Sequence, residues 1–468
     1  MDQPHLKRSL GLLDVALFFV IAGSNLQWVA TAAAAGPSSL VVWLIGCGAM
    51  FVPLSIVVVY LSSHHPEEGG MYVWSKRAFG PFAGFITGWT YWTSNLPYFP
   101  ALLYFAAGNA LFVSGNNGGV LAASPWYFIA VSILGLGLAT LVNVLGLDVG
   151  KWLNNVGAIS RWGVTLLLIA LGGLAYWKFG SATHIDAASI RPGLQVKDLI
   201  FWSVIAFAWT GPEALPFMAG EIKQPRRSIP FGLAIAAPAI AAIYILGTIS
   251  VMWSLPSADV NASSGVMQAV GNVATRFGWV FLTPIAAVLV AVSCLGSAGA
   301  WLGAVARIPF VAGLDRYLPP VFGRLHPRWG SPVVALVTQS AIAAVFIFLG
   351  QGGTSVKGAY DVLVSSTVLI TMVPFVFLFA SAIKLYAEPS TPEMVRVPGG
   401  RVTVVACALV GLTTTFVAMA LALIPAQDEP NKTLAVGKVI FLTALMVLSG
   451  VAVYFAGKRK AVAVSSAP

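Results

Sequence analysis

The sequence predicts an all-α polytopic membrane protein with about 12 transmembrane helices, and three observations lead to this fold class. The 468 residues are 58% hydrophobic and only 9% charged, a composition typical of chains that cross a bilayer many times. The apolar residues gather into runs that can each span a bilayer, at about 20 residues. One run contains Gly211-Pro212-Glu213, which indicates a helix that is interrupted within the membrane.

The apolar runs and the basic residues together define the expected topology. Most of the 26 Lys and Arg residues fall in the two tails and the even-numbered loops, so both termini are expected on the cytoplasmic side of the cell (inner) membrane. The predicted runs are Leu10–Ala35, Leu40–Leu61, Phe82–Val113, Trp126–Leu145, Trp152–Trp177, Leu199–Gly220, Ile229–Trp253, Trp279–Val305, Val333–Gly350, Val362–Tyr386, Val402–Ile424 and Val436–Ala456.

Composition argues against several classes of function. The three cysteines all lie in apolar runs and show neither a disulfide pattern nor metal-ligand spacing. All five histidines lie outside the runs, which excludes a histidine relay within the membrane. The net charge of +10 reflects the basic loops and does not indicate nucleic acid. We therefore expect no cofactor, no metal and no nucleic-acid partner, and we expect the lipid bilayer to surround the chain.

The interruption in the sixth run has a direct physical cause. Pro212 has no N–H, so the carbonyl of Ala208, four residues earlier, loses its helical partner. Gly211 tolerates non-helical backbone angles. Glu213 puts an ionisable group near the middle of the span, where such groups are costly and usually functional. We interpret this as a helix that stops, unwinds and restarts; the alternative is a plain proline kink with a buried, protonated Glu213.

The first run carries a second interruption, Ala22-Gly23-Ser24-Asn25. Small residues at this place are also compatible with ordinary close packing of membrane helices. The position favours the stronger interpretation, because runs one and six each open a block of five runs. Interrupted spans at corresponding positions of two halves are the best sequence pointer to a transporter site. Half-helix N-termini in such sites attract anions and unpaired carbonyls attract cations.

Several motifs, in this order and spacing, resemble the amino acid–polyamine–organocation (APC) superfamily of secondary transporters. The eighth-run motif is similar to that of the bacterial arginine/agmatine antiporter. Two departures stand out: Asn25 replaces a family glycine, and Phe207 stands where that antiporter has Trp, so arginine is only one of the possible substrates. The motifs are Ile21–Asn25, Pro66–Tyr72, Gly84–Trp92, Phe207–Glu213 followed by Glu221–Pro230, Cys294–Trp301, Leu318–Pro320 and His326–Pro332.

The resemblance implies a domain organisation. Residues 10–386 would form a ten-helix, LeuT-like core of five-plus-five inverted repeats, covering about 10–177 and 199–386, with helices one and six broken. Residues 387–456 would add two transmembrane helices. Residues 1–9 and 457–468 would be cytoplasmic tails. A homodimer stays an open expectation.

The resemblance also implies roles within a substrate site. Backbone N–H groups at Gly23, Ser24 and Asn25 would hold a carboxylate. An ammonium group would bind carbonyls of the sixth-helix break, at Phe207, Ala208 and Thr210. The proline argument identifies Ala208 independently. The remaining candidates for the substrate site lie in the two breaks or on the helices expected to surround them: Ala22, Tyr91, Trp209, Gly211 and Trp301.

Three aromatic residues in this set have specific implied positions. Phe207 would gate the site from outside, Trp301 would form its floor and Tyr91 would stand at a gate in the third helix. The alternative for each aromatic is lipid contact or core packing. Phe18, by contrast, is expected to face lipid.

Arg161 is an ionisable residue within the fifth run. In exchange-type and proton-coupled members of the superfamily, a Lys at a similar place often takes the position of a sodium ion. An Arg there carries a permanent charge, because arginine is not deprotonated in proteins. We expect its guanidinium to contact carbonyls near Ala22 or hydroxyls at Ser293 or Ser297, and any pH dependence to pass through Glu213. The alternative is an Arg that snorkels to the interface.

These observations favour a sodium-independent amino acid transporter that works by alternating access, as a permease or an antiporter. A polyamine or organic-cation transporter of the same superfamily is the alternative. A membrane-embedded enzyme would need paired catalytic groups, but Glu213 has no such partner in a span. A receptor would be expected to carry a soluble signalling domain, and no loop or tail has that length.

Overall fold

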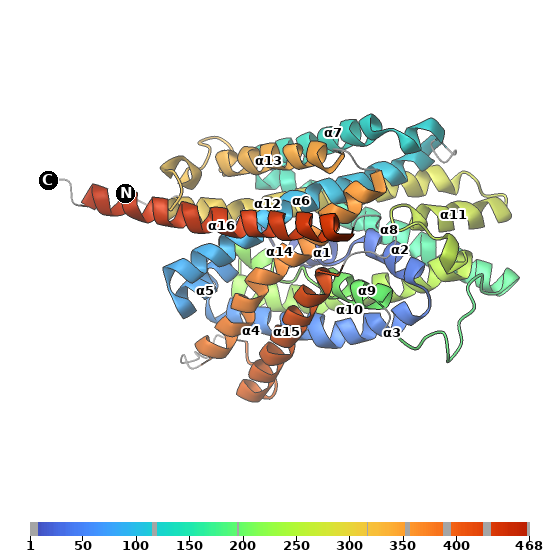
Figure 1. Cartoon of the computed structure of the whole chain (residues 1–468), viewed down its shortest axis with the longest axis horizontal. Coiled ribbons are helices and arrows are strands. Elements are labelled where there is room, and N and C mark those ends of the chain that lie inside the picture. Colours follow the sequence, from blue (N-terminus) through green and yellow to red (C-terminus); the bar gives the residue numbers. More distant parts are fainter. Residues whose placement is uncertain are drawn as a thin grey trace.

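The computed structural model describes residues 8–114, 119–193, 196–315, 317–351, 356–386, 395–424 and 432–465. In these ranges the protein is a bundle of helices, most of which run along its longest axis (Figure 1). The helices are α1 (Leu12–Gly23), α2 (Leu26–Ala35), α3 (Ser38–Gly46), α4 (Val52–His64), α5 (Met71–Phe79), α6 (Pro81–Ala110), α7 (Pro125–Val144), α8 (Leu147–Phe179), α9 (Val196–Ala208), α10 (Pro225–Ser254), α11 (Gly265–Arg276), α12 (Leu282–Leu314), α13 (Val333–Gln351), α14 (Val356–Leu385), α15 (Gly400–Ala422) and α16 (Lys432–Ser465).

Within the described ranges, ten helical stretches are long and apolar enough to span a membrane, which makes this a polytopic membrane protein. About twelve spans were predicted, and the difference has two sources. The sixth run is not one long helix, because α9 ends at Ala208. In the ninth run, only Val333–Phe348 of α13 counts as a described apolar stretch, and it is shorter than 18 residues. The ten stretches are Leu12–Ala35, Ser38–His64, Pro81–Ser114, Pro125–Val144, Asp148–Phe179, Pro225–Ser254, Leu282–Ala312, Val364–Leu385, Gly400–Ala422 and Val436–Lys458.

The helix boundaries follow from local chemistry. α6 and α10 both begin with a proline, at Pro81 and Pro225, where the missing N–H costs nothing. α7 also begins with a proline, and Ser124 caps it by accepting a hydrogen bond from the N–H of Tyr127. Gly80 lies at φ +91° before α6, a conformation that favours glycine.

The core of the bundle lies around α6. In the apolar stretch that contains α6, 89% of the most hydrophobic window is buried, compared with 28% in α15 and 22% in α16. α6 packs against α12 and α14, while α1 packs against α8, α10 and α12. The apolar faces of α15 and α16 are therefore left to the bilayer, and the polar residues discussed below lie on the inner helices.

Candidate functional site

The first predicted interruption is present. α1 ends at Gly23, and Ser24 and Asn25 are extended, with φ,ψ of −131°, 141° and −143°, 130°. The Asn25 side chain accepts a hydrogen bond from the N–H of Gln27 at 3.3 Å and so caps α2. The Ser24 hydroxyl donates to the carbonyl of Val20 at 2.5 Å. The break is thus a short extended segment between two helices.

The sixth-run interruption is an unwound segment, so the alternative of a plain proline kink is wrong. α9 ends at Ala208, and Gly211 lies at φ +130°. Thr210 donates to the carbonyl of Phe207 from its hydroxyl at 2.7 Å and from its N–H at 2.9 Å. The N–H of Gly211 donates to Oε2 of Glu213 at 2.7 Å. After a turn, the chain continues as a 3₁₀ helix over Leu215–Glu221.

The two interruptions lie directly against each other, as the sequence predicted. A Cβ atom placed on Gly211 would come within 2.6 Å of Cα of Gly23 and within 3.0 Å of the carbonyl oxygen of Ala22. The absence of a Cβ at Gly211 lets the two backbones approach so closely. The packing of α9 against α2, and of α1 against the Leu215–Glu221 segment, places the breaks in the centre of the bundle.

Tyr244 of α10 connects the two breaks, and sequence reasoning missed it. Its hydroxyl donates toward the carbonyl of Ala208 at 2.9 Å and that of Gly23 at 3.2 Å, and it accepts from the N–H of Asn25 at 3.2 Å. Tyr244 lies within a long, mostly apolar run, so nothing in the local sequence distinguishes it from a packing tyrosine.

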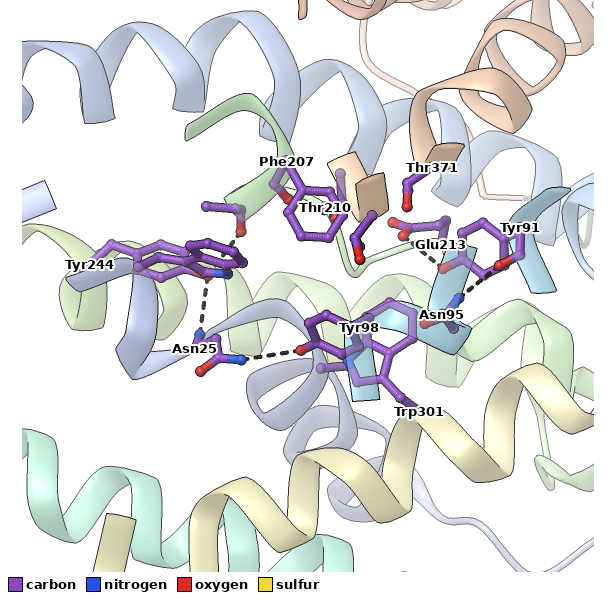
Figure 2. A pocket seen from close by; sticks show the side chains of 14 residues that line it. Asn25, Tyr91, Asn95, Tyr98, Phe207, Thr210, Glu213, Tyr244, Trp301 and Thr371 are labelled. Atoms are coloured by element: carbon purple, nitrogen blue, oxygen red, sulfur yellow. Dashed lines mark hydrogen bonds between the residues drawn. The ribbon is translucent and has the colours of Figure 1, made fainter. Parts of the chain in front are cut away.

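A small cavity lies beside the breaks (Figure 2). Its free volume of about 20 Å³ is about that needed for one water molecule, so a substrate enters only if side chains move. Eight predicted site residues line it: Ala22, Asn25, Tyr91, Phe207, Ala208, Thr210, Glu213 and Trp301. Six residues that were not predicted from the sequence also line the cavity: Trp28, Asn95, Tyr98, Tyr244, Thr367 and Thr371.

Four other predicted site residues lie at the breaks but do not line the cavity. Gly23 and Gly211 form the backbone crossing, and the Ser24 side chain is turned back toward its own helix. Trp209 points away, because its indole Nε1 donates to the carbonyl of Trp43 at 3.1 Å and its ring packs edge-on against Trp43.

The cavity has two chemically different ends (Figure 2). At one end, Asn25 and Tyr244 lie beside the broken backbone, and the Asn25 amide also donates to the hydroxyl of Tyr98 at 3.1 Å. At the other, the hydroxyl of Tyr91 donates to Oε1 of Glu213 at 2.9 Å. Among the described residues that line the cavity, Glu213 is the only carboxyl group, and it is fully buried.

Aromatic rings form the walls between these ends. Phe207 meets Trp28 edge-on at 5.6 Å between ring centroids, and Trp301 lies 5.9 Å from Tyr98. Nε1 of Trp301 is buried without a hydrogen-bond partner in the described part of the chain. Phe18, expected to face lipid, is buried at 4% exposure, so that expectation is wrong.

If Phe207 and Trp301 cover a bound substrate, Phe207→Ala and Trp301→Ala should each reduce uptake about tenfold or more. The reason is the loss of a large apolar contact in a desolvated site. Phe416→Ala is the matched control, because Phe416 of α15 is 54% exposed on the outer surface. Initial rates of uptake into liposomes test this. Equal, mild effects in all three variants would assign the two cavity aromatics to packing.

Arg161 is fully buried, which excludes the snorkelling alternative. Its guanidinium donates to the Ser297 hydroxyl at 2.7 Å, to the Ser293 carbonyl at 3.3 Å and to the Ile21 carbonyl at 3.4 Å. The predicted contacts are therefore present, with Ser293 contributing its carbonyl, because its hydroxyl donates to Val290. Arg161 thus joins α8 and α12 to the last turns of α1 before the break.

Two glycines allow this arrangement. A Cβ on Gly157, one turn before Arg161, would come within 2.6 Å of Cα of Gly296. α8 and α12 therefore touch along their backbones, which brings Arg161 against Ser297. In the described part of the chain, no carboxylate forms an ion pair with Arg161; the groups on which its charge acts include the hydroxyls of Tyr98 and Tyr244, which line the cavity.

Comparisons with known proteins agree with this architecture. A family model described as amino acid permease matches residues 10–452. An uncharacterized transporter of Legionella pneumophila is 27% identical over 97% of this chain and 98% of its own length. A probable agmatine/putrescine antiporter of Lactococcus lactis is 24% identical, with 93% of each chain covered. A glutamate/serine transporter of Bacillus subtilis is 26% identical, with 75% of this chain and 67% of the relative covered.

A solved structure also has a similar fold. The crystal structure of MhsT in complex with L-phenylalanine superimposes with a TM-score of 0.63. The match covers 89% of this chain and 99% of the MhsT chain, at 13% sequence identity. At that identity the likeness shows the LeuT-like fold alone.

Proposed function

We propose, because the chain belongs to the amino acid permease family, that it carries an amino acid across the membrane by alternating access and without sodium. Family membership makes it a transporter and not an enzyme. The observation that carries the finer proposal is the buried guanidinium of Arg161, which joins α8 and α12 to the first break. A fixed cation at this place would do electrostatically what a bound sodium ion does in other transporters, namely stabilise carbonyls at a broken helix.

The charge pattern of the site supports an amino acid substrate. A fully buried cation without a carboxylate partner is costly, and a substrate carboxylate bound near the first break would offset part of that cost. The substrate ammonium would lie near the sixth break, where carbonyl oxygens and Glu213 attract a positive charge. The unpartnered Nε1 of Trp301 is a further donor on the cavity wall. An amino acid has one positive and one negative group. Glu213 on the cavity wall and Arg161 beside the last turn of α1 offer one charge of each sign.

A diamine is the second candidate, because one relative is named as a probable agmatine/putrescine antiporter. Its two ammonium groups would need two negative partners, whereas Glu213 is the only carboxyl among the described residues that line the cavity. The second ammonium would also lie in the field of Arg161. The electrostatics of the site therefore favour the amino acid.

Purified protein in liposomes tests the choice. Vesicles preloaded with a mixture of unlabelled amino acids should take up labelled amino acids, and a large excess of external putrescine should leave that uptake unchanged. Vesicles preloaded with putrescine and given labelled putrescine should show only background uptake. Putrescine exchange without amino acid uptake would replace the proposal by the second candidate.

We also propose that any pH dependence of transport passes through Glu213. Its carboxyl oxygens accept hydrogen bonds from Tyr91 on α6 and from Gly211 in the sixth break, so a change in its charge acts on both segments. Glu213→Gln should flatten the pH profile of uptake yet leave substrate binding measurable. Uptake rates across a pH series, with binding followed by thermal shift, check this. An unchanged profile would remove Glu213 from coupling.

The remaining parts of the proposal concern organisation. Interruptions that open the first and sixth spans support two inverted repeats, over about 10–177 and 199–386. The excess of Lys and Arg in alternate loops supports cytoplasmic termini. Single cysteines introduced in place of Ser9 or Ser189 test the orientation. In right-side-out vesicles, a membrane-impermeant thiol reagent should label the cysteine at position 189 and not that at position 9.

A further inference from the structure

Two interrupted helices create a problem for any closed form of this protein. Every backbone carbonyl that leaves a helix inside the membrane needs another donor, because bulk water does not reach it when the site is sealed. Here the carbonyls of Gly23 and Ala208, one from each break, both face the hydroxyl of Tyr244. The same hydroxyl accepts from the N–H of Asn25. One side chain therefore satisfies backbone groups of both breaks.

The position of this hydroxyl is fixed by the packing of its ring. The ring of Tyr244 stacks on Trp43 with 4.3 Å between centroids and 12° between planes. Trp209 meets it edge-on at 5.1 Å. Trp43 is itself held, because its Nε1 donates to the hydroxyl of Thr248 at 3.0 Å. Tyr244 is only 1% exposed, so its ring is held in place within this stack.

A substrate ammonium would compete with this hydroxyl for one of the same acceptors. Under the proposed function, the ammonium binds carbonyls of the sixth break, including that of Ala208. An ammonium has three N–H donors, whereas the phenol has one proton shared between two carbonyls at 2.9 and 3.2 Å. The tyrosine hydroxyl is thus the donor that the chain itself supplies where a substrate would otherwise be needed.

We propose that Tyr244 is a positioning residue that lets the unloaded transporter close and change its facing direction, so that the protein catalyses net transport and not only exchange. The inference rests on the proposed function. A transporter whose breaks are satisfied only by substrate cannot seal its site without substrate, and it exchanges one molecule for another. With the Tyr244 hydroxyl in place, the carbonyls of Gly23 and Ala208 have a donor in the closed form whether or not substrate is bound.

Tyr244→Phe separates the two modes, because it removes the hydroxyl and keeps the ring stack. The unloaded return step should slow about tenfold, the effect expected when a buried carbonyl loses its donor. The loaded step should change by less than about threefold, because the ammonium still supplies donors to the sixth break. The measurement is uptake of labelled amino acid into liposomes with and without internal unlabelled amino acid. The ratio of these two rates should rise several-fold.

Tyr104→Phe is the matched control. Tyr104, on α6, is likewise a buried tyrosine whose hydroxyl donates to a backbone carbonyl, that of Ile347 at 2.6 Å, but this bond involves neither break. It should leave the ratio of exchange to net uptake unchanged. A merely structural role for Tyr244 would lower both rates in proportion, and that result would overturn the proposal.

A second variant covers the case in which Tyr244→Phe does not fold. Trp43→Phe keeps the hydroxyl but removes the indole on which the Tyr244 ring stacks, so the ratio should shift in the same direction by a smaller factor. An unchanged ratio in every folded variant would also overturn the proposal. Absence of amino acid transport in the unmutated protein would instead refute the proposed function, so the two failures are distinguishable.

Discussion

Replacing Arg161 by methionine is expected to reduce amino acid uptake about 100-fold and to leave the melting temperature no lower than that of the unmutated protein. The guanidinium donates to the Ser297 hydroxyl and to the carbonyls of Ser293 and Ile21, and two lost charge-assisted hydrogen bonds suffice for an effect of this size. Stability should hold because methionine also removes a buried charge that forms no ion pair in the described part of the chain.

Uptake rates and thermal unfolding in detergent test this pair of expectations. Arg276→Met is the control, because Arg276 lies on the exposed end of α11. Its guanidinium packs over the ring of Phe179, so only a small effect on either quantity is expected. An Arg161→Met protein that transports normally would remove Arg161 from the mechanism. A protein that is inactive and also strongly destabilised would make Arg161 a structural residue.

Gly211→Ala is expected to abolish transport. A Cβ at this position would lie 2.6 Å from Cα of Gly23 and 3.0 Å from the carbonyl oxygen of Ala22. A Cβ atom does not approach another carbon atom as closely as 2.6 Å. The φ angle of +130° adds strain for any residue with a Cβ. The two breaks would have to separate, which would displace the Tyr244 hydroxyl from at least one of them.

Gly36→Ala separates backbone strain from the steric clash. Gly36 lies at φ +91°, but a Cβ there would meet nothing within 4 Å. This variant should lose some stability and keep most of its uptake, because only the conformational cost applies. Similar, moderate losses in both variants, measured as initial uptake rates at matched expression, would show that contact between the breaks is not essential.

Local chemistry allowed the two interruptions to be predicted from the sequence. Pro212 removes a donor and Gly211 permits an unusual backbone angle, so the unwound segment follows from the residues themselves. The contacts of Arg161 could also be predicted. A charged group within an apolar run needs oxygen atoms as hydrogen-bond partners, and the family resemblance implied which helices lie next to it. Helices one and six are therefore broken where expected.

The direction of side chains beyond a break could not be predicted. Trp209 follows the last helical residue of α9, so the helical period no longer fixes which way it points; it packs on Trp43, outside the cavity. Phe18 shows the same limit in a helix, because an apolar residue in an apolar run is equally compatible with lipid and with core. Its burial is decided by neighbours that are distant in the sequence.

The cavity residues that sequence reasoning missed are polar or aromatic side chains within long apolar runs. Asn95 and Tyr98 lie on α6, and Tyr244 lies on α10. Asn95 donates to the carbonyl of Tyr91 one turn earlier in the same helix, a bond that does not indicate a role in a site. The importance of these residues arises only when α6, α10 and the two breaks meet, as the hydrogen bonds of Asn25 to Tyr98 and to Tyr244 show.

The most direct test of sodium-independent amino acid transport is accumulation in liposomes under an imposed sodium gradient. Protein-containing vesicles should be given a labelled amino acid substrate with an inward gradient of sodium, or of choline at the same ionic strength. We expect equal initial rates and equal final levels in the two conditions, because the Arg161 guanidinium is permanently charged. Accumulation driven by sodium in the unmutated protein would contradict this expectation.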